Sequence, residues 1–359
     1  MKQINISIMA GDGIGPEVME SAIKVLDSIS NIYSFKINYT HLLVGGASFD
    51  KYKSHLTQET LQKASKTDAI LFGSVGGPVS DQQNPKWKNC EKNSILSLRK
   101  HFNFNTNLRP IKVYPELIDI CPLKESIVKK GIDILIIREL SEDIYFGEHK
   151  TIQVSGKKIA YDQAFYTEEC IRKIAHTAFK TALKRNKKLT SVDKANVLDT
   201  SVLWREIFNE VKEEYPEVEY QDMLVDNCAM QLITKPFNFD CIVTSNMFGD
   251  ILSDLASVFP GSLGLCPSIS FSDNNFNMYE PSGGSAQDIV GKGIANPIAQ
   301  ILSAALMLKY SFNLDKEAKS IFTAIEKVIS SDSRTIDISS TGTYLSTKEI
   351  TDKIIDNLI

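Results

Sequence analysis

The sequence predicts an α/β protein built on a mostly parallel sheet. Residues 4–10, INISIMA, have the apolar, β-branched composition of a buried strand, and residues 16–29 follow with helical spacing and Pro16 in the first turn. A second buried strand is predicted at 67–75. This strand–helix–strand order is typical of parallel sheets covered by helices. At 359 residues the chain exceeds the size of one usual compact core, so we expect two domains.

The middle of the chain repeats this alternation. Strands are predicted at 131–140, 190–198, 218–226 and 239–247, and helices at 167–186, 199–214 and 296–312. Residues 151–162, TIQVSGKKIAYD, instead predict a hairpin that turns at Ser155 and Gly156. A two-stranded arm of this kind can pair with another chain.

Composition narrows the class of protein. The net charge is −4, so we expect neither nucleic acid nor an anionic membrane as partner. No apolar run approaches the roughly 20 residues that span a bilayer. The N-terminal MKQINISIMAGDGIG lacks the features of a signal peptide, which predicts a cytoplasmic protein. The six cysteines form no CxxC pair and the five histidines do not cluster, so free thiols are expected rather than a zinc site.

Two glycine-rich segments suggest nucleotide binding to different degrees. In AGDGIGP, Gly11 and Gly13 match the start of a Rossmann fingerprint, but Pro16 occupies the third glycine position, so we interpret the segment as a tight turn. The loop 280–296, EPSGGSAQDIVGKGIAN, contains four glycines around Asp288. Backbone amides freed of side chains can approach phosphate, and an aspartate can bind ribose hydroxyls. A plain surface loop is the alternative, and the residues alone leave both open.

Charged side chains give a further signal. Asp250 and Asp254 stand four residues apart on a predicted helix, where like charges repel. Alone, the pair favours a solvated helix edge over a divalent cation site. Only seven of the 40 basic residues are arginines, which hints that some of them bind carboxylate or phosphate.

Six segments, in order and over nearly the whole chain, extend this interpretation. They are NSILSLRKHFNFNTNLRP (93–110), REL with IYFG (138–147), VDKANVL (192–198), VDNCAMQL (225–232), SNMFGDILSD (245–254) and GGSAQDIVGKGIANP (283–297). Together they resemble the isopropylmalate branch of the isocitrate/isopropylmalate dehydrogenase family, whose members are metal-dependent β-decarboxylating dehydrogenases. The resemblance implies two α/β domains sharing a central mixed sheet, distinct from a standard Rossmann domain. The first would join 1–104 to 262–359, and the second would cover 105–261 with the hairpin arm.

The resemblance also assigns roles to residues. It implies that Asp226, Asp250 and Asp254 hold Mg²⁺ or Mn²⁺, and that Lys194 and Tyr145 are the catalytic base and acid. Arg99, Arg109, Arg138 and Asp226 would bind the substrate, with Ile95, Leu96 and Val197 as an apolar wall. Gly76, Gly77 and Glu91 would lie along the nicotinamide, and Gly284, Ser285, Ala286, Asp288, Ile289 and Asn296 along the adenosine of NAD. The family implies a homodimer in which Lys194 and Asp226 reach into the partner's cleft.

The expected function is NAD-dependent oxidative decarboxylation of (2R,3S)-3-isopropylmalate in leucine biosynthesis. An isopropyl group fits this apolar wall, whereas the additional carboxylate of isocitrate does not. Burying an unpaired carboxylate there would cost several kcal/mol. A related enzyme acting on isocitrate, homoisocitrate, tartrate or malate is one alternative, and a non-catalytic nucleotide-binding protein is another. The chain departs from the family at Glu142 and Asp143, which replace a small turn, and at Cys90 and Leu255. Gln287 replaces a proline, which predicts a looser adenosine loop.

Overall fold

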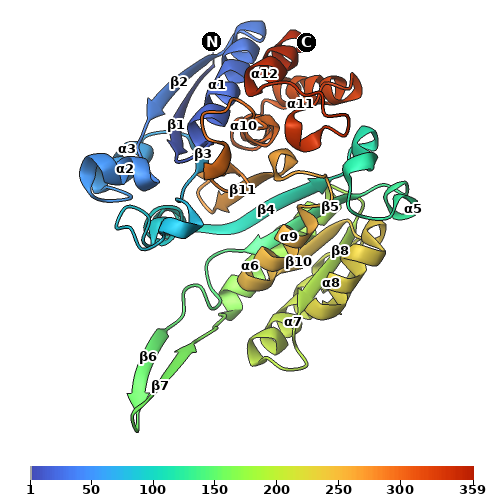
Figure 1. Ribbon diagram of the computed structural model, residues 1–359. Helices are drawn as coiled ribbons and strands as arrows, with labels where there is room; N and C mark the ends of the chain where they lie inside the picture. The colour runs from blue at the N-terminus through green and yellow to red at the C-terminus, as the bar shows by residue number, and fades with distance from the viewer. Residues whose placement is uncertain (1) are drawn as a thin grey trace. The chain divides into compact units, whose positions relative to one another are not determined.

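The computed structural model describes residues 2–359 and divides into two compact units, each of mixed α/β structure (Figure 1). The first unit comprises Met1–Phe104, Tyr114–Pro122 and Ser257–Ile359, and the second comprises Asn105–Val113 and Leu123–Ala256. The predicted α/β fold class is confirmed.

The strands of the first unit lie in the order β2-β1-β3-β12-β11. Their bounds are β1 Gln3–Gly11, β2 Lys36–His41, β3 Ala69–Ser74, β11 Pro267–Ser272 and β12 Asn277–Pro281. Strand β1 pairs parallel with β2 and β3, and β12 pairs parallel with β3 but antiparallel with β11. The strand and following helix predicted near the N-terminus are therefore confirmed.

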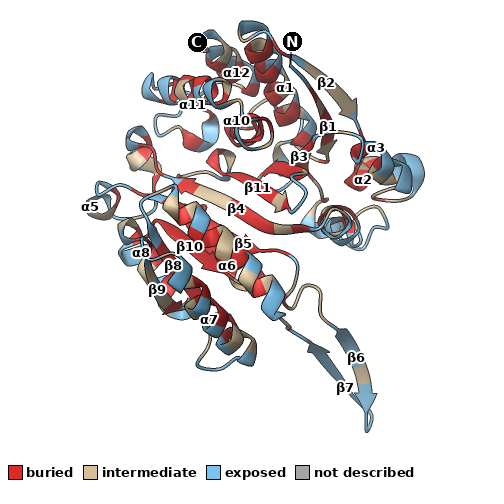
Figure 2. Cartoon of the chain, turned by 180° about the vertical axis from the view of Figure 1, so that it is seen from behind, coloured by how far each residue is buried: buried red, intermediate tan, exposed pale blue. Residues whose placement is uncertain are grey.

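Helices α1 Gly15–Ile32, α10 Ile298–Phe312, α11 Asp315–Ser330 and α12 Thr347–Asp356 pack together in the first unit. Helix α1 buries Val18, Ala22 and Ile29 at helical spacing against this group. Helix α10 is buried nearly all round, as Figure 2 shows, which accounts for the strongly apolar composition of its sequence. The unit also holds α2 Gly45–Tyr52, α3 Gln58–Ala64, a π-helix at Lys92–Leu96, α4 Ser97–His101 and the 3₁₀ turns η1 Val79–Asp81, η3 Pro115–Ile120, η6 Leu263–Leu265, η7 Gln287–Ile289 and η8 Ile336–Ile338.

The strands of the second unit lie in the order β4-β5-β10-β8-β9. Their bounds are β4 Phe104–Lys112, β5 Asp133–Glu139, β8 Lys188–Asp193, β9 Glu219–Leu224 and β10 Cys241–Thr244. Strand β4 is antiparallel to β5, and the other four strands run parallel. The helices are α5 Glu125–Val128, α6 Glu168–Leu183, α7 Asp199–Val211, α8 Val225–Thr234 and α9 Asn246–Ala256, with the short turns η4 Lys212–Glu214 and η5 Pro236–Asn238.

Parallel strands bring their carboxyl ends to one edge of a sheet, where binding residues commonly gather. Arg138 lies near the end of β5, Lys194 directly follows β8, and α8 and α9 begin directly or shortly after β9 and β10. Three predicted strands end two or more residues earlier than expected: β8 stops at Asp193, β9 at Leu224 and β10 at Thr244. Asp226 therefore lies in the first turn of α8 and not at a strand end.

A separate two-stranded sheet forms the predicted hairpin arm (Figure 1). Strand β6 His149–Val154 pairs antiparallel with β7 Lys157–Asp162, and the turn is made by Ser155 and Gly156, both with positive φ. Nearly every residue of the arm is exposed (Figure 2). The six cysteines are free, as expected, and within residues 2–359 no helix has the length and apolar character that crossing a membrane requires.

Candidate functional site

The first candidate site lies in the second unit, around the side chain of Arg138. Arg138 is only 2% exposed, and its Nη1 forms an ion pair with Asp250. Its Nε donates to Asn246 Oδ1 at 2.9 Å. A buried guanidinium requires such partners, because an uncompensated charge in the protein interior is strongly unfavourable.

Arg109 on β4 places a second guanidinium next to helix α9, which carries Asn246, Asp250 and Asp254. Its Nη1 donates to Asp254 Oδ1 at 2.9 Å and to Ser253 Oγ at 2.8 Å, and its Nη2 lies 3.6 Å from Asp250 Oδ1. The two carboxylates that the sequence placed on one helical face therefore face two arginines. This arrangement offsets the like-charge repulsion between Asp250 and Asp254.

Tyr145 completes this cluster. Its hydroxyl donates to Asp250 Oδ2 at 2.8 Å, and the Arg138 guanidinium carbon lies 5.4 Å from the centroid of its ring. Burial, followed by the hydrogen bond to Asp250, raises the pKa of Tyr145 above its ordinary value. The phenol therefore keeps its proton at neutral pH.

Lys194 and Asp226 form a separate ion pair in the second unit. The hydrogen bond from Lys194 is the main cause of a lowered pKa at Asp226, which stays ionised at neutral pH. Within residues 2–359, no group of three or more His, Cys, Asp or Glu side chains is arranged to hold a metal ion. The structure thus brings Asp250 and Asp254 together but does not group Asp226 with them in one chain.

Arg99 lies in the first unit, on α4. Its Nη2 lies 3.1 Å from Glu280 Oε1, and both residues are buried. Its Nε is buried without a hydrogen-bond partner among the residues described. An arginine with a donor to spare suits an anionic ligand. Glu280 was not predicted as a site residue, although it is the first residue of the glycine-rich loop 280–296.

The predicted apolar wall is divided between the two units. Ile95 and Leu96 are half-buried in the π-helical turn of the first unit, whereas Val197 belongs to the second and is 67% exposed. The common role assigned to these three residues therefore stays a prediction.

The second candidate site is a cavity of ≈ 280 Å³ within the first unit. Four of the residues predicted to bind a cofactor line it, namely Gly284, Ala286, Ile289 and Asn296. Ile14 and Leu263 add apolar walls, and Asp337 adds a carboxylate that the sequence interpretation missed. A largely apolar cavity with a few polar groups is typical of small-molecule sites.

The early glycine turn helps to shape this cavity. Ile14 N donates to Ser285 O at 2.9 Å, which ties the turn to the predicted adenosine loop. Gly13 has φ +63°, and a Cβ there would lie 1.9 Å from Ser285 O. Gly13 is therefore required because the backbone of the second glycine loop lies where a side chain would be. The segment is a tight turn, as predicted, and not a Rossmann fingerprint.

Asp12 organises the neighbouring segment. Its carboxylate accepts hydrogen bonds from Gly46 N at 2.8 Å, Ala47 N at 2.9 Å and Gly76 N at 3.1 Å. A Cβ on Gly76 would lie 2.5 Å from Glu91 Oε1, so Gly76 and Glu91 are direct neighbours, as their predicted common role requires. Asp12 was not predicted as a site residue.

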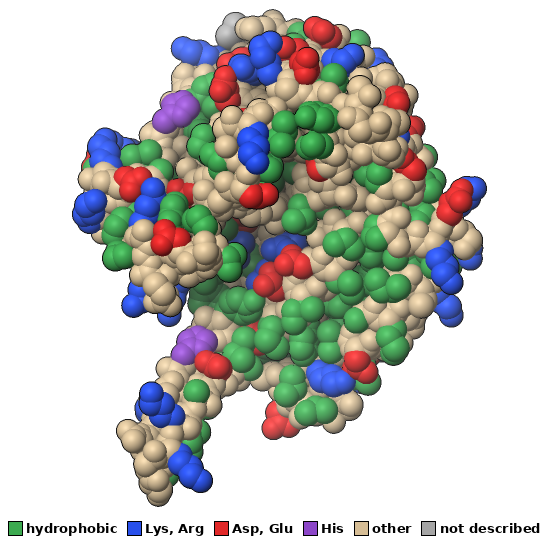
Figure 3. All heavy atoms as spheres, in the orientation of Figure 1, with side chains coloured by type: hydrophobic (Ala, Val, Ile, Leu, Met, Phe, Trp, Pro, Cys, Tyr) green, Lys and Arg blue, Asp and Glu red, His purple; other side chains and the backbone are tan. Residues whose placement is uncertain are grey.

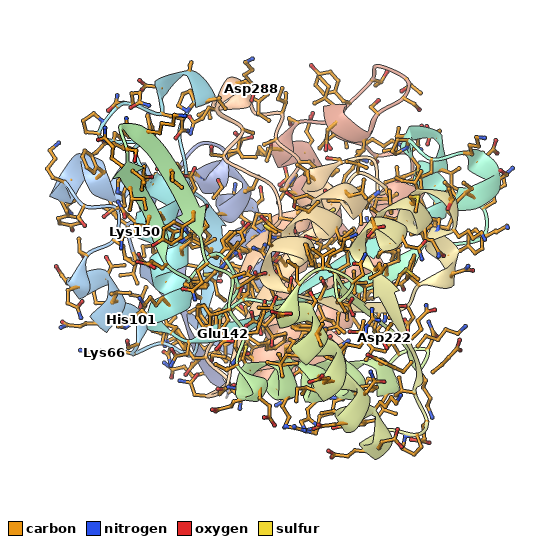
Figure 4. The ribbon with its side chains drawn as sticks, turned by 90° about the horizontal axis from the view of Figure 1, so that it is seen from below. Lys66, His101, Glu142, Lys150, Asp222 and Asp288 are labelled. Carbon is orange, nitrogen blue, oxygen red and sulfur yellow. The ribbon has the colours of Figure 1, made fainter. Side chains whose placement is uncertain are left out.

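The expected loosening at Gln287 is not what the structure shows. Gln287 Nε2 donates to Gly76 O at 2.8 Å, which links the segments predicted to bind the two ends of the cofactor. A proline has no side-chain donor and could not make this bond. Asp288, labelled in Figure 4, is exposed in the adjacent turn η7 and does not itself line the cavity.

Comparison with known proteins agrees with this geometry. The sequence model of the family described as isocitrate/isopropylmalate dehydrogenase matches residues 5–354. A 3-isopropylmalate dehydrogenase of Aquifex aeolicus is 52% identical over 100% of this chain and 98% of its own length, and one of Haemophilus influenzae is 49% identical over 98% of each. Among solved structures, isocitrate dehydrogenase from Methylococcus capsulatus aligns with a TM-score of 0.86 at 30% identity, covering 99% of both chains.

The two aspartates of α9 should differ in their effect on stability. Asp250→Ala removes the carboxylate that faces buried Arg138 and accepts from Tyr145, so we expect a loss of about 2 kcal/mol in the free energy of unfolding. Asp254→Ala is the matched control: its side chain is 68% exposed, and the expected loss is below about 1 kcal/mol. Urea unfolding measures both values, and equal losses would contradict this assignment.

Proposed function

The chain belongs to the isocitrate/isopropylmalate dehydrogenase family, and on that premise we propose that it is an NAD-dependent, metal-dependent dehydrogenase. The proposed reaction converts (2R,3S)-3-isopropylmalate to 4-methyl-2-oxopentanoate and carbon dioxide, a step of leucine biosynthesis. The observation that carries it is the cluster of Arg109, Arg138, Tyr145, Asp250 and Asp254. Relatives bearing this enzyme name are about half identical to the chain, whereas the isocitrate dehydrogenase structure is 30% identical.

Substrate recognition follows from the arginines and the apolar residues. We propose that Arg99, Arg109 and Arg138 bind the two carboxylates, because guanidinium groups match carboxylate geometry. Ile95, Leu96 and Val197 would face the isopropyl group. If the three side chains enclose the isopropyl group as proposed, a third carboxylate would be buried there without a partner, and isocitrate would be a poor substrate.

The donor set fits a hard divalent cation. Asp250 and Asp254 present carboxylate oxygens from one helical face, and Asp226 of a second copy would supply the third, as the family resemblance implies. A Mg²⁺ or Mn²⁺ ion held there would supply Lewis-acid polarisation of the C2 oxygen of the substrate, and NAD would supply the hydride acceptor.

The chain's own residues move the protons. Lys194 is ion-paired with Asp226 in the structure, so it must first leave this pair and release its own proton to solvent. The neutral amine would then accept the proton of the C2 hydroxyl. The ketone so formed is β to a carboxylate, so carbon dioxide can leave. Tyr145, held in its protonated form, then donates a proton to C3.

The first-unit cavity is the proposed adenosine site. Its glycine loop carries Asp288, whose carboxylate can accept both hydroxyls of a ribose. The same carboxylate would repel the 2′-phosphate of NADP, so NAD is the proposed cofactor. Gly76 and Glu91 would lie toward the nicotinamide.

A homodimer is the proposed working form. Helices α8 and α9 pack together and expose large apolar side chains, including Met230, Ile233 and Ile251, which are 60%, 40% and 59% exposed. Figure 3 shows apolar side chains gathered on this face of the second unit. Exposed apolar patches mark protein interfaces, and the arm can extend the contact by strand pairing.

The direct test of this function is the absorbance of NADH formed from isopropylmalate with Mg²⁺ or Mn²⁺. We expect turnover that a chelator abolishes and that Lys194→Ala eliminates while the far-ultraviolet circular dichroism is unchanged. Isocitrate, homoisocitrate, tartrate and malate should react at least about 100-fold more slowly. Comparable rates on isocitrate would refute the proposed pocket.

A second prediction concerns the glycine turn. Gly13→Ala should raise the KM for NAD about tenfold, because the added Cβ must displace the loop at Ser285. Gly342→Ala is the matched control, since Gly342 also has positive φ, at +77°, but a Cβ there meets nothing within 4 Å. It should leave the KM for NAD unchanged, and equal effects of the two changes would argue against a role for Gly13 in cofactor binding.

A third prediction tests whether active sites are shared between subunits. Lys194→Ala and Asp250→Asn should each be inactive alone. If the two positions belong to different subunits of one site, refolding an equal mixture should restore about a quarter of the parent activity through heterodimers with one intact site. Co-refolding without recovery, although heterodimers form, would show that both positions act within one chain.

A further inference from the structure

We propose that Asp143 is a positioning residue: its carboxylate caps helix α9 and thereby holds Tyr145 against Asp250. This inference rests on the proposed function, in which Tyr145 donates the proton to carbon. The carboxylate of Asp143 accepts hydrogen bonds from the backbone of Ile144 and Met247 and not from the side chain of Tyr145. It acts through the backbone of its loop and through the first turn of α9.

The backbone of Asp143 is unusual. Its φ is +77°, in the left-handed region that favours glycine, so an aspartate there is held by its surroundings. Aspartate tolerates this region better than most residues, because its short side chain can hydrogen-bond locally. The residue is also buried, with only 6% of its surface exposed.

The hydrogen bonds of the carboxylate explain why it is held. Asp143 Oδ2 accepts from Met247 N at 2.9 Å, and Oδ1 accepts from Ile144 N at 2.8 Å. Met247 lies in the first turn of α9, where backbone N–H groups have no partner within the helix. A carboxylate at this end also interacts favourably with the helix dipole.

Neighbouring contacts fix the loop from both sides. Asn246, at the start of α9, donates from Nδ2 to Glu142 O at 3.1 Å while its Oδ1 accepts from Arg138. Glu142, labelled in Figure 4, accepts from Thr167 N at 2.7 Å and from Thr167 Oγ1 at 2.8 Å at the start of α6. The loop is therefore tied to two helices, and the two acids that depart from the family pattern make these ties.

Asp143 links the loop that carries Tyr145 to the helix that carries Asp250. Tyr145 is two residues after Asp143, and Asp250 is one helical turn after Asn246 and Met247. The 2.8 Å contact between the Tyr145 hydroxyl and Asp250 therefore depends on the loop and the helix keeping their relative position. Proton donation requires placement within hydrogen-bond reach, and small displacements reduce rates strongly.

Three substitutions distinguish a positioning role of Asp143 from a loop that only connects β5 to the following chain. Asp143→Gly keeps the left-handed backbone without strain but removes the cap. Asp143→Asn retains a side-chain oxygen and tolerance of positive φ. Asp332→Gly is the matched control, because Asp332 is an aspartate at φ +55° that the site does not use.

The measurements are kcat, the KM values for isopropylmalate and NAD, and the thermal unfolding midpoint of each full-length variant. We expect Asp143→Gly to lower kcat at least tenfold with both KM values within threefold of the parent, and Asp143→Asn to restore kcat to within threefold. Asp332→Gly should leave kcat unchanged.

Two results would overturn the inference. One is an Asp143→Gly variant with parental kcat, which would make the loop a connector only. The other is a loss of kcat in Asp143→Gly that is not restored in Asp143→Asn, or that is fully explained by a smaller fraction of folded protein. An inactive parent chain would instead refute the proposed function, so the two failures are distinguishable.

Discussion

The second-unit site depends on one buried charge, the guanidinium of Arg138. It lies at the end of a strand with almost no exposure, so it must be compensated within the protein. Asp250 supplies the opposite charge and Asn246 a neutral acceptor, and both come from α9. Gly249 lies between them, and a Cβ there would approach Arg138 Cγ to 2.6 Å. The need to pair one cation thus sets the distance of α9 from β5 and the positions of its carboxylates.

This pairing also bears on cation binding. Asp250 and Asp254 would repel each other on an exposed helix, yet here each faces an arginine. The same guanidinium groups are the proposed ligands of the substrate carboxylates. The divalent cation would bind the aspartates and the substrate carboxylates would bind the arginines. These are the same charged groups that neutralise one another in the protein without ligands. Binding both together preserves the charge balance, whereas binding either alone leaves carboxylates or guanidinium groups without counter-charge.

Local patterns predicted the helices, the strands and the arm, and the family resemblance predicted which residues share a site. Long-range contacts account for what both missed. Helical spacing placed Asp250 and Asp254 on one face, and alternation with a Ser-Gly turn predicted the arm. The partner of Arg99, Glu280, is 181 residues away, and no local pattern connects them. Gln287 suggested a looser loop, but its bond to Gly76 spans 211 residues. Asp143 was visible as a departure from the family, while its positive φ and its helix cap depend on tertiary structure.

Left-handed backbone occurs at both candidate sites, and the space around Cβ decides which residue can occupy it. At Gly13 the carbonyl of Ser285 fills the position of a side chain, so both the conformation and the close approach require glycine. The Asp143 side chain instead reaches the first turn of α9, where it accepts from Met247 N, an N–H group that has no partner within the helix. There a side chain with an acceptor gains hydrogen bonds that offset its backbone strain. Glycine would satisfy the backbone at Asp143 but would leave the first turn of α9 without its carboxylate partner.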